Sequence, residues 1–224
     1  MTHLESELAQ LKYNLIEMWK LVKNQMSKAK EALINEDRDL AREVVSVEKR
    51  VNAYELSIDQ DCENIFALFN PVAVDLRLVL AIIKINNNLE RQGDSAKGIA
   101  KFVIDIDGAF DKKLLEITRI VEMFDENIVM LNELIEAFEK EDGIIARRTF
   151  KRDELLDDIN DETTSVVANY IRGNIDNAEQ AIQILSIIRK LERTGDHSKN
   201  IAEEIIFYTE AKVLKHRVKE KTKE

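Results

Sequence analysis

The chain has 224 residues, a formal net charge of −10, six glycines and one proline. The negative charge argues against general nucleic-acid binding, because counterion release from phosphates requires a basic face on the protein. The longest uncharged apolar run, Leu78 to Ile83, is too short to cross a bilayer, and the first residues show no signal-peptide pattern. A lone cysteine, Cys62, rules out an intrachain disulfide, so we expect a cytoplasmic protein in which Cys62 is buried among apolar residues.

Sparse helix breakers divide the chain into six predicted helices, and no stretch shows the period-two alternation of a strand. The breaks fall at residues 35–37, at Asn70-Pro71, at Gly108, at Gly143 and at residues 173–174. At the second break we expect Asn70 to cap the next helix and Pro71 to be its first residue. The predicted helices span residues 3–34, 38–69, 71–106, 110–140, 142–172 and 175–214.

A duplication organises these helices. One pentad occurs twice, 102 residues apart, as Glu90-Arg91-Gln92-Gly93-Asp94 and as Glu192-Arg193-Thr194-Gly195-Asp196. The helix before each pentad carries a second matched set, 105 residues apart, made by Glu48, Asn52 and Glu55 and by Asp153, Asp157 and Asn160. Short connections make consecutive helices antiparallel. The sequence therefore predicts an all-α fold of two tandem, pseudo-symmetric three-helix bundles, residues 1–107 and 108–224.

The repeated acidic residues form a candidate metal site in each bundle. Carboxylates four residues apart share one helix face, where like charges cost roughly 0.2–0.5 kcal/mol per pair, and a bound cation would offset that cost. Oxygen ligands without cysteine favour Mg, Mn, Fe or Ca over a structural zinc site. The candidate metal-site residues are Glu48, Asn52, Glu55, Glu90, Asp94, Asp153, Asp157, Asn160, Glu192 and Asp196.

A simpler interpretation of the same acids stays open. A basic residue lies three positions before and three after each pentad aspartate, at Arg91, Lys97, Arg193 and Lys199. The acids could then form only solvated ion pairs along one helix. His197, which adjoins Asp196, is a further candidate ligand in the second bundle alone.

The pentad glycines belong to an apolar stripe with four-three spacing, which is expected to face the core. A glycine inside a helix costs about 1 kcal/mol relative to alanine. Gly93 and Gly195 occupy the same place in both copies, which indicates close helix approach or room for a ligand. The stripe comprises Ile82, Asn86, Leu89, Gly93, Ala96 and Ala100 in the first copy and Ile184, Ile188, Leu191, Gly195, Ser198 and Ala202 in the second.

Several motifs together resemble the PhoU family over nearly the whole chain. They are Val51-Asn52-Ala53-Tyr54-Glu55, Pro71-Val72-Ala73-Val74-Asp75-Leu76-Arg77, Leu89-Glu90-Arg91-Gln92-Gly93-Asp94, Leu191-Glu192-Arg193-Thr194-Gly195-Asp196-His197 and Asn200-Ile201-Ala202-Glu203. The chain departs from the family pattern at Gln92 and Thr194, where an isoleucine usually precedes the motif glycine.

The resemblance implies a cytoplasmic, usually homodimeric regulator that restrains the phosphate-starvation response. The implied partners are the ATPase subunit of a phosphate ABC transporter and a membrane sensor histidine kinase, so membrane contact would be peripheral. Some family members hold multinuclear metal clusters on Glu/Asp-x-x-x-Asp motifs, which favours iron here, with Mg, Mn or Zn as alternatives. The motif is met at positions 90/94, 153/157 and 192/196, whereas Asn52 interrupts it after Glu48, so we expect fewer or weaker metals in the first bundle.

Two other functions compete with a regulator. Di-iron oxidases built in helical bundles require Glu-x-x-His pairs, but Gly93 and Gly195 occupy the histidine positions after the pentad glutamates. No nucleophile–base arrangement or phosphate-binding glycine loop is visible either, so we expect no enzyme. The alternatives are a carboxylate-bridged metalloenzyme of unknown substrate and a helical scaffold, with or without metal.

Overall fold

The computed structural model describes residues 2–106 and 108–214, which are helical and contain no strand. In chain order the helices are α1 (His3–Asn35), α2 (Arg38–Phe69), α3 (Ala73–Asp105), α4 (Lys112–Ile117), α5 (Ile120–Lys140), α6 (Gly143–Gly173), the 3-10 turn η1 (Ile175–Asn177) and α7 (Ala178–Glu210). The predicted all-α fold is confirmed. Among the described residues, no helix combines the length and apolarity needed to span a membrane.

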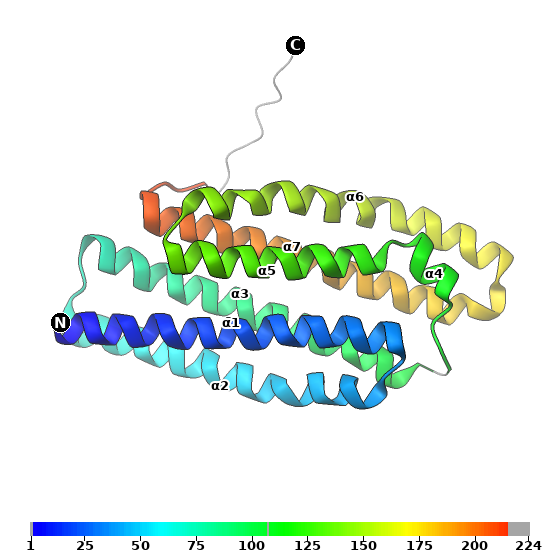
Figure 1. Cartoon of the computed structure of the whole chain (residues 1–224), viewed down its shortest axis with the longest axis horizontal. Helices are drawn as coiled ribbons and strands as arrows, with labels where there is room; N and C mark the ends of the chain where they lie inside the picture. The colour runs from blue at the N-terminus through cyan, green and yellow to red at the C-terminus, as the bar shows by residue number, and fades with distance from the viewer. Residues whose placement is uncertain (1, 107, 215–224) are drawn as a thin grey trace, which may run out of the picture.

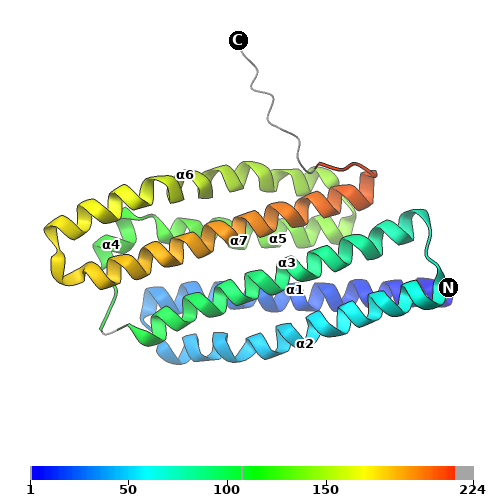
Figure 2. The same ribbon diagram turned by 180° about the vertical axis from the view of Figure 1, so that it is seen from behind.

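The six long helices lie along one axis and form two three-helix bundles, α1–α3 and α5–α7 (Figure 1). Helices α3 and α7 lie side by side and pack about as closely as α3 packs against α1 (Figure 2). One continuous apolar core runs through both bundles, and the rings of Trp19 on α1 and Phe138 on α5 lie 6.1 Å apart within it. The boundary between residues 107 and 108 stays a prediction, and residues 1, 107 and 215–224 of the predicted domains lie outside the described part.

Side-chain caps fix the starts of three long helices. Thr2 and Glu5 form a reciprocal capping box at α1, with bonds of 3.2 and 2.8 Å. Asp37 accepts two backbone N–H bonds at the start of α2, and Asp142 does the same at the start of α6. Such caps contribute about 1 kcal/mol each, which explains why these starts were readable from short polar residues in the sequence.

The start of the third helix differs from the prediction. Asn70 is not its N-cap, because Asn70 adopts the left-handed conformation (φ 46°) and ends α2 as its C-cap. Pro71 lies in the connection, Val72 is the N-cap residue, and α3 begins at Ala73 instead of Pro71. Asparagine is one of the few residues that enter this conformation readily, and proline commonly follows such a C-cap. The dipeptide signalled the break correctly but was assigned to the wrong helix end.

Two other predicted helices are shorter than expected. The helix predicted over residues 110–140 is broken between α4 and α5, where Arg119 has a positive φ of 53° and Thr118 donates to the carbonyl of Leu114. No glycine or proline marks this break, so the pattern of breakers could not reveal it. The helix predicted over residues 175–214 begins as η1 and ends at Glu210, because Ala211 is left-handed (φ 55°).

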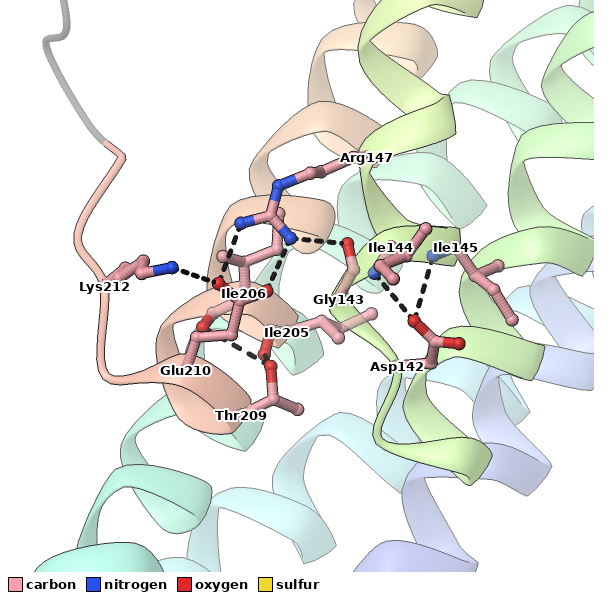
Figure 3. Close-up of polar contacts among 10 residues, drawn as sticks. All are labelled: Asp142, Gly143, Ile144, Ile145, Arg147, Ile205, Ile206, Thr209, Glu210 and Lys212. Atoms are coloured by element: carbon pink, nitrogen blue, oxygen red, sulfur yellow. Dashed lines mark hydrogen bonds and ion pairs between the residues drawn. The ribbon is translucent and has the colours of Figure 1, made fainter.

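A bidentate ion pair between Arg147 and Glu210 joins the start of α6 to the end of α7 (Figure 3). The guanidinium of Arg147 donates to both carboxylate oxygens of Glu210, over 2.5 and 2.9 Å, and also to the carbonyl of Gly143. Lys212 donates to the same carboxylate over 2.9 Å. A side chain at position 143 would collide with Glu210, so glycine permits this contact.

Candidate functional site

Both predicted apolar stripes face the interior, and all of their members are buried. The pentad acids follow the stripes at the edge of the core. Glu90 and Glu192 are half-buried, whereas the side chains of Asp94 and Asp196 are 52% and 47% exposed. The helix of each pentad packs against the preceding helix of its bundle, α3 against α2 and α7 against α6.

In the first bundle a lysine links the two helices. The Lys97 ammonium on α3 donates to Glu48 Oε1 on α2 over 2.7 Å and to Asp94 Oδ1 over 3.5 Å. Asn52 donates to the same Glu48 oxygen over 3.1 Å. Burial favours the neutral form of Glu48, but the hydrogen bonds from Lys97 and Asn52 outweigh it and lower its pKa. Lys97 therefore compensates the charge on the Glu48 and Asp94 side of this acidic cluster.

The second bundle repeats the arrangement with a more deeply buried acid. The Lys199 ammonium on α7 donates to Asp153 Oδ2 on α6 and, over 2.8 Å, to Asp196 Oδ1. The Asp153 side chain is only 5% exposed, and its Oδ1 atom has no hydrogen-bond partner among the described residues. Burial raises the pKa of Asp153 despite Lys199, so a buried carboxylate oxygen is left incompletely compensated.

The other acids of each cluster remain under mutual repulsion. Burial raises the pKa of Glu90, and the nearby charges of Asp94 and Glu55 raise it further. Burial likewise raises the pKa of Glu55. In the second bundle burial, Asp196 and Asp157 raise the pKa of Glu192 in that order. Burial first, and then neighbouring carboxylates, thus disfavour the ionised forms of these acids, and an added cation would favour those forms.

The predicted residues are thus gathered, but not as a ready-made coordination shell. Within residues 2–106 and 108–214, no group of three or more His, Cys, Asp or Glu side chains is positioned to hold a metal. Asn160 is half-buried on α6, and none of the described hydrogen bonds joins it to the cluster. Of the ion pairs foreseen in the simpler interpretation, the described residues show those of Lys97 with Asp94 and of Lys199 with Asp196, but none from Arg91 or Arg193 to the pentad aspartates. Lys97 and Lys199 also reach across to the neighbouring helix, which helical spacing could not show.

The two pentads also share a surface pocket of about 760 Å³ between α3 and α7. His197 lies there, and its Nδ1 atom is 3.0 Å from Asn88 Oδ1 on α3, so it faces the first bundle instead of Asp153. Burial, followed by the charge of Arg91, lowers the pKa of His197. The pocket is lined by Glu90, Arg91, Asp94, Ser95, Arg193, Asp196, His197 and Asn200.

Comparison with known proteins identifies the family. The PhoU domain profile matches residues 15–103 and 120–205, one segment in each half of the chain. This chain belongs to the PhoU family. A PhoU homologue from Thermotoga maritima is 32% identical over 95% of this chain and 91% of its own length. The accessory protein PhoU of Escherichia coli is 30% identical over 94% and 87%. A crystal structure of PhoU from Pseudomonas aeruginosa superposes with a TM-score of 0.87, at 30% identity, covering 93% of this chain and 99% of that one.

Membership of the PhoU family settles the broad class of function. These relatives are named as accessory proteins of phosphate-specific transport, and a structure from Streptococcus pneumoniae as a phosphate transport system regulatory protein. The family comprises accessory and regulatory proteins and not enzymes, which confirms the expectation that this chain is not an enzyme.

The departure from the PhoU pattern at Gln92 has a structural role that the sequence did not reveal. Gln92 is buried, and its amide donates to the carbonyl of Thr194 over 3.0 Å and to Ser198 Oγ over 2.8 Å. These bonds cross from α3 to α7 and connect one pentad directly to the other. A buried polar residue with partners on the facing helix specifies the register between the two repeats.

Proposed function

We propose that this protein restrains the phosphate-starvation response as a metal-binding adaptor between a phosphate ABC transporter and a sensor histidine kinase. The observation that carries the regulatory part is the PhoU match in both halves of the chain. An adaptor needs no catalytic group, because it shifts a partner's equilibrium by its differential affinity for two states. The tandem bundles would offer two similar surfaces, to the transporter ATPase subunit or to the kinase, with a gain in avidity.

The test is a deletion strain that carries a starvation-responsive reporter. In ample phosphate the deletion should raise reporter expression, and a plasmid copy of the protein should restore repression. Phosphate uptake recorded in the same cultures separates an effect on the transporter from an effect on the kinase. An unchanged reporter together with unchanged uptake would contradict the regulatory proposal.

We further propose that the acidic clusters bind a multivalent metal. Support comes from the unpartnered, buried Oδ1 atom of Asp153 and from the raised pKa values of Glu90 and Glu192, which a metal would relieve. Hard oxygen donors suit iron, which the resemblance favours, and also Mg or Mn, whereas Zn is a weaker match. The ligands would come from Glu48, Asn52, Glu55, Glu90 and Asp94 in one bundle and from Asp153, Asp157, Asn160, Glu192 and Asp196 in the other.

Metal analysis of protein purified without chelator tests this second proposal. Changing the four pentad acids Glu90, Asp94, Glu192 and Asp196 to alanine should abolish bound metal. A matched control changes four acids that form ion pairs within single helices or at their ends, namely Glu17, Asp39, Glu122 and Glu136. Equal metal content in both variants would show that the metal, if any, is bound elsewhere.

We also propose that the protein is a cytoplasmic homodimer. The end of α2, the connection after it and the start of α3 expose apolar side chains that a partner surface would cover, since Leu68, Val72 and Val74 are 71%, 69% and 52% exposed. Sedimentation of the wild type and of Val72→Asp tests this. A monomeric wild type would refute the dimer, and an unaffected dimer in the variant would place the interface elsewhere.

A further inference from the structure

Each bundle contains one lysine that occupies the same position relative to the acids. Lys97 and Lys199 follow the pentad aspartates by three residues and are themselves 102 residues apart. Each ammonium lies between a carboxylate of the pentad and a carboxylate of the preceding helix. The contact therefore joins α3 to α2 in one bundle and α7 to α6 in the other, which a surface pair within one helix does not.

The position of each lysine coincides with the place where a bridging cation would be most effective. The ammonium uses the oxygens that connect the helices, Glu48 and Asp94 in one bundle and Asp153 and Asp196 in the other. It carries a single positive charge and three donors without fixed directions, so it partly satisfies these oxygens. A multivalent metal needs the same oxygens and would be repelled by an ammonium a few ångströms away, so the two compete for this position.

A second observation shows that the lysine leaves the site unsatisfied. In the second bundle, Lys199 is bonded to Asp153 through Oδ2, while the buried Oδ1 atom lacks a partner in the described structure. This atom lies beside the pentad backbone, because a Cβ placed on Gly195 would be 3.0 Å from it. An unpartnered carboxylate oxygen at this depth is hydrogen-bonding capacity that the lysine does not satisfy.

We infer that Lys97 and Lys199 are tethered counter-ions, which occupy the cation positions of the two acidic clusters and must withdraw before a metal bridges the helices. This inference rests on the proposed metal binding. It assigns the lysines the role of setting the affinity for metal, so that loading the metal would also release two ammonium groups to the surface.

Lys199 makes closer contacts with its carboxylates than Lys97 does, so the inference predicts a different effect for each lysine. Lys199 donates to a nearly buried carboxylate and, over 2.8 Å, to Asp196. Lys97 donates to Glu48, whose side chain is 12% exposed, and its contact with Asp94 is 3.5 Å long. Lys199 is the stronger competitor, so removing it should increase metal affinity more than removing Lys97.

The experiment titrates Mn²⁺ into metal-stripped, full-length protein by calorimetry. Lys199→Met should bind Mn²⁺ about tenfold more tightly than the wild type in one class of site, the equivalent of about 1.4 kcal/mol. Lys97→Met should give a smaller increase, and Lys199→Arg, which keeps the charge, should leave the affinity close to that of the wild type. Lys140→Met is the control for net charge, because Lys140 pairs with Glu136 within α5. Circular dichroism checks that each variant stays helical.

Chemical labelling gives an independent readout of release. Mn²⁺ should increase the acetylation of Lys199 and Lys97 in the wild type by a small, amine-reactive acetylating reagent. The acetylation of Lys140 should not change. Unchanged or weaker Mn²⁺ binding by Lys199→Met, with binding intact in the wild type, would overturn the lysine role while leaving the metal site standing. Tighter binding by Lys140→Met to the same extent would reduce the effect to net charge and also overturn it. Absence of Mn²⁺ binding in every variant would overturn both proposals.

Discussion

The substitution Gly195→Ala tests how closely α6 approaches α7 at the second acidic cluster. A Cβ atom on Gly195 would lie 2.5 Å from Leu156 Cδ1 and 3.0 Å from Asp153 Oδ1. Leu156 is fully buried, so its methyl group has little room to move, and Asp153 is held by Lys199. The corresponding Cβ on Gly93 meets its nearest neighbours only at 3.3 Å.

The magnitude follows from two opposing effects. Alanine is more favourable than glycine inside a helix by about 1 kcal/mol. Overpacking of a filled core costs about 1–3 kcal/mol, because side chains or backbone must shift. For Gly195→Ala the crowding should prevail, with a net loss of up to about 2 kcal/mol. For Gly93→Ala the milder contacts should nearly cancel the helix gain, which leaves the unfolding free energy within about 0.5 kcal/mol of the wild type.

Urea denaturation followed by circular dichroism measures both variants under the same conditions. The comparison between the two glycines is more informative than either value, since the helix-propensity gain is common to them. We expect Gly195→Ala to have the lower midpoint, by about 1–2 kcal/mol when converted with a shared slope. A Gly195→Ala variant as stable as Gly93→Ala would refute the argument that the glycine is required by the approach of Leu156 and Asp153.

Three further predictions follow from the same structure. Burial and then Asp196 raise the pKa of Glu192 above 4.5, so ionisation of Glu192 opposes folding. Glu192→Gln should therefore increase the unfolding free energy at pH 7 by roughly 0.5 kcal/mol. This gain should vanish as the pH falls below 4.5, where the wild-type glutamate is neutral in both states. Cys62 is fully buried, and burial, with the charge of Asp59, raises its pKa to about 12. A thiol reagent at about pH 8 should therefore label Cys62 only when urea unfolds the chain. Rapid labelling of the native protein would contradict this prediction. Arg147→Ala should lower the urea midpoint through loss of the contact with Glu210 (Figure 3), and an unchanged midpoint would show that the pair contributes nothing.

The helices themselves were predictable from local chemistry. Asp37 and Asp142 cap the helices that follow them, and the predicted span 38–69 coincides with α2. Such signals are local, because a capping oxygen and the N–H groups it satisfies lie within three residues of each other. The errors lie at single residues: Asn70 and Arg119 both adopt the left-handed conformation, and tertiary packing, not local spacing, decides where a residue other than glycine accepts it.

The apolar stripes and the matched acidic residues were also readable, because a period of 3.6 residues fixes which side chains share a helix face. Because the same acidic residues recur in both halves of the chain, the pairing of α2 with α3 and of α6 with α7 could be inferred before any contact was known. The repeat could not show which acid of a cluster is buried. In the second bundle Asp153 is buried, whereas Asp157, Glu192 and Asp196 are not.

Only the tertiary structure decided how the acids are compensated. Periodicity places Lys199 beside Asp196, but the bond to Asp153 depends on the distance between α6 and α7, which the buried side chains around Gly195 determine. The same holds for Gln92, whose partners lie 102 and 106 residues further along the chain. The sequence by itself determined which groups are on each helix face; the packing of one helix against another determined which of them meet, because contacts between distant segments depend on the whole core and not on local spacing.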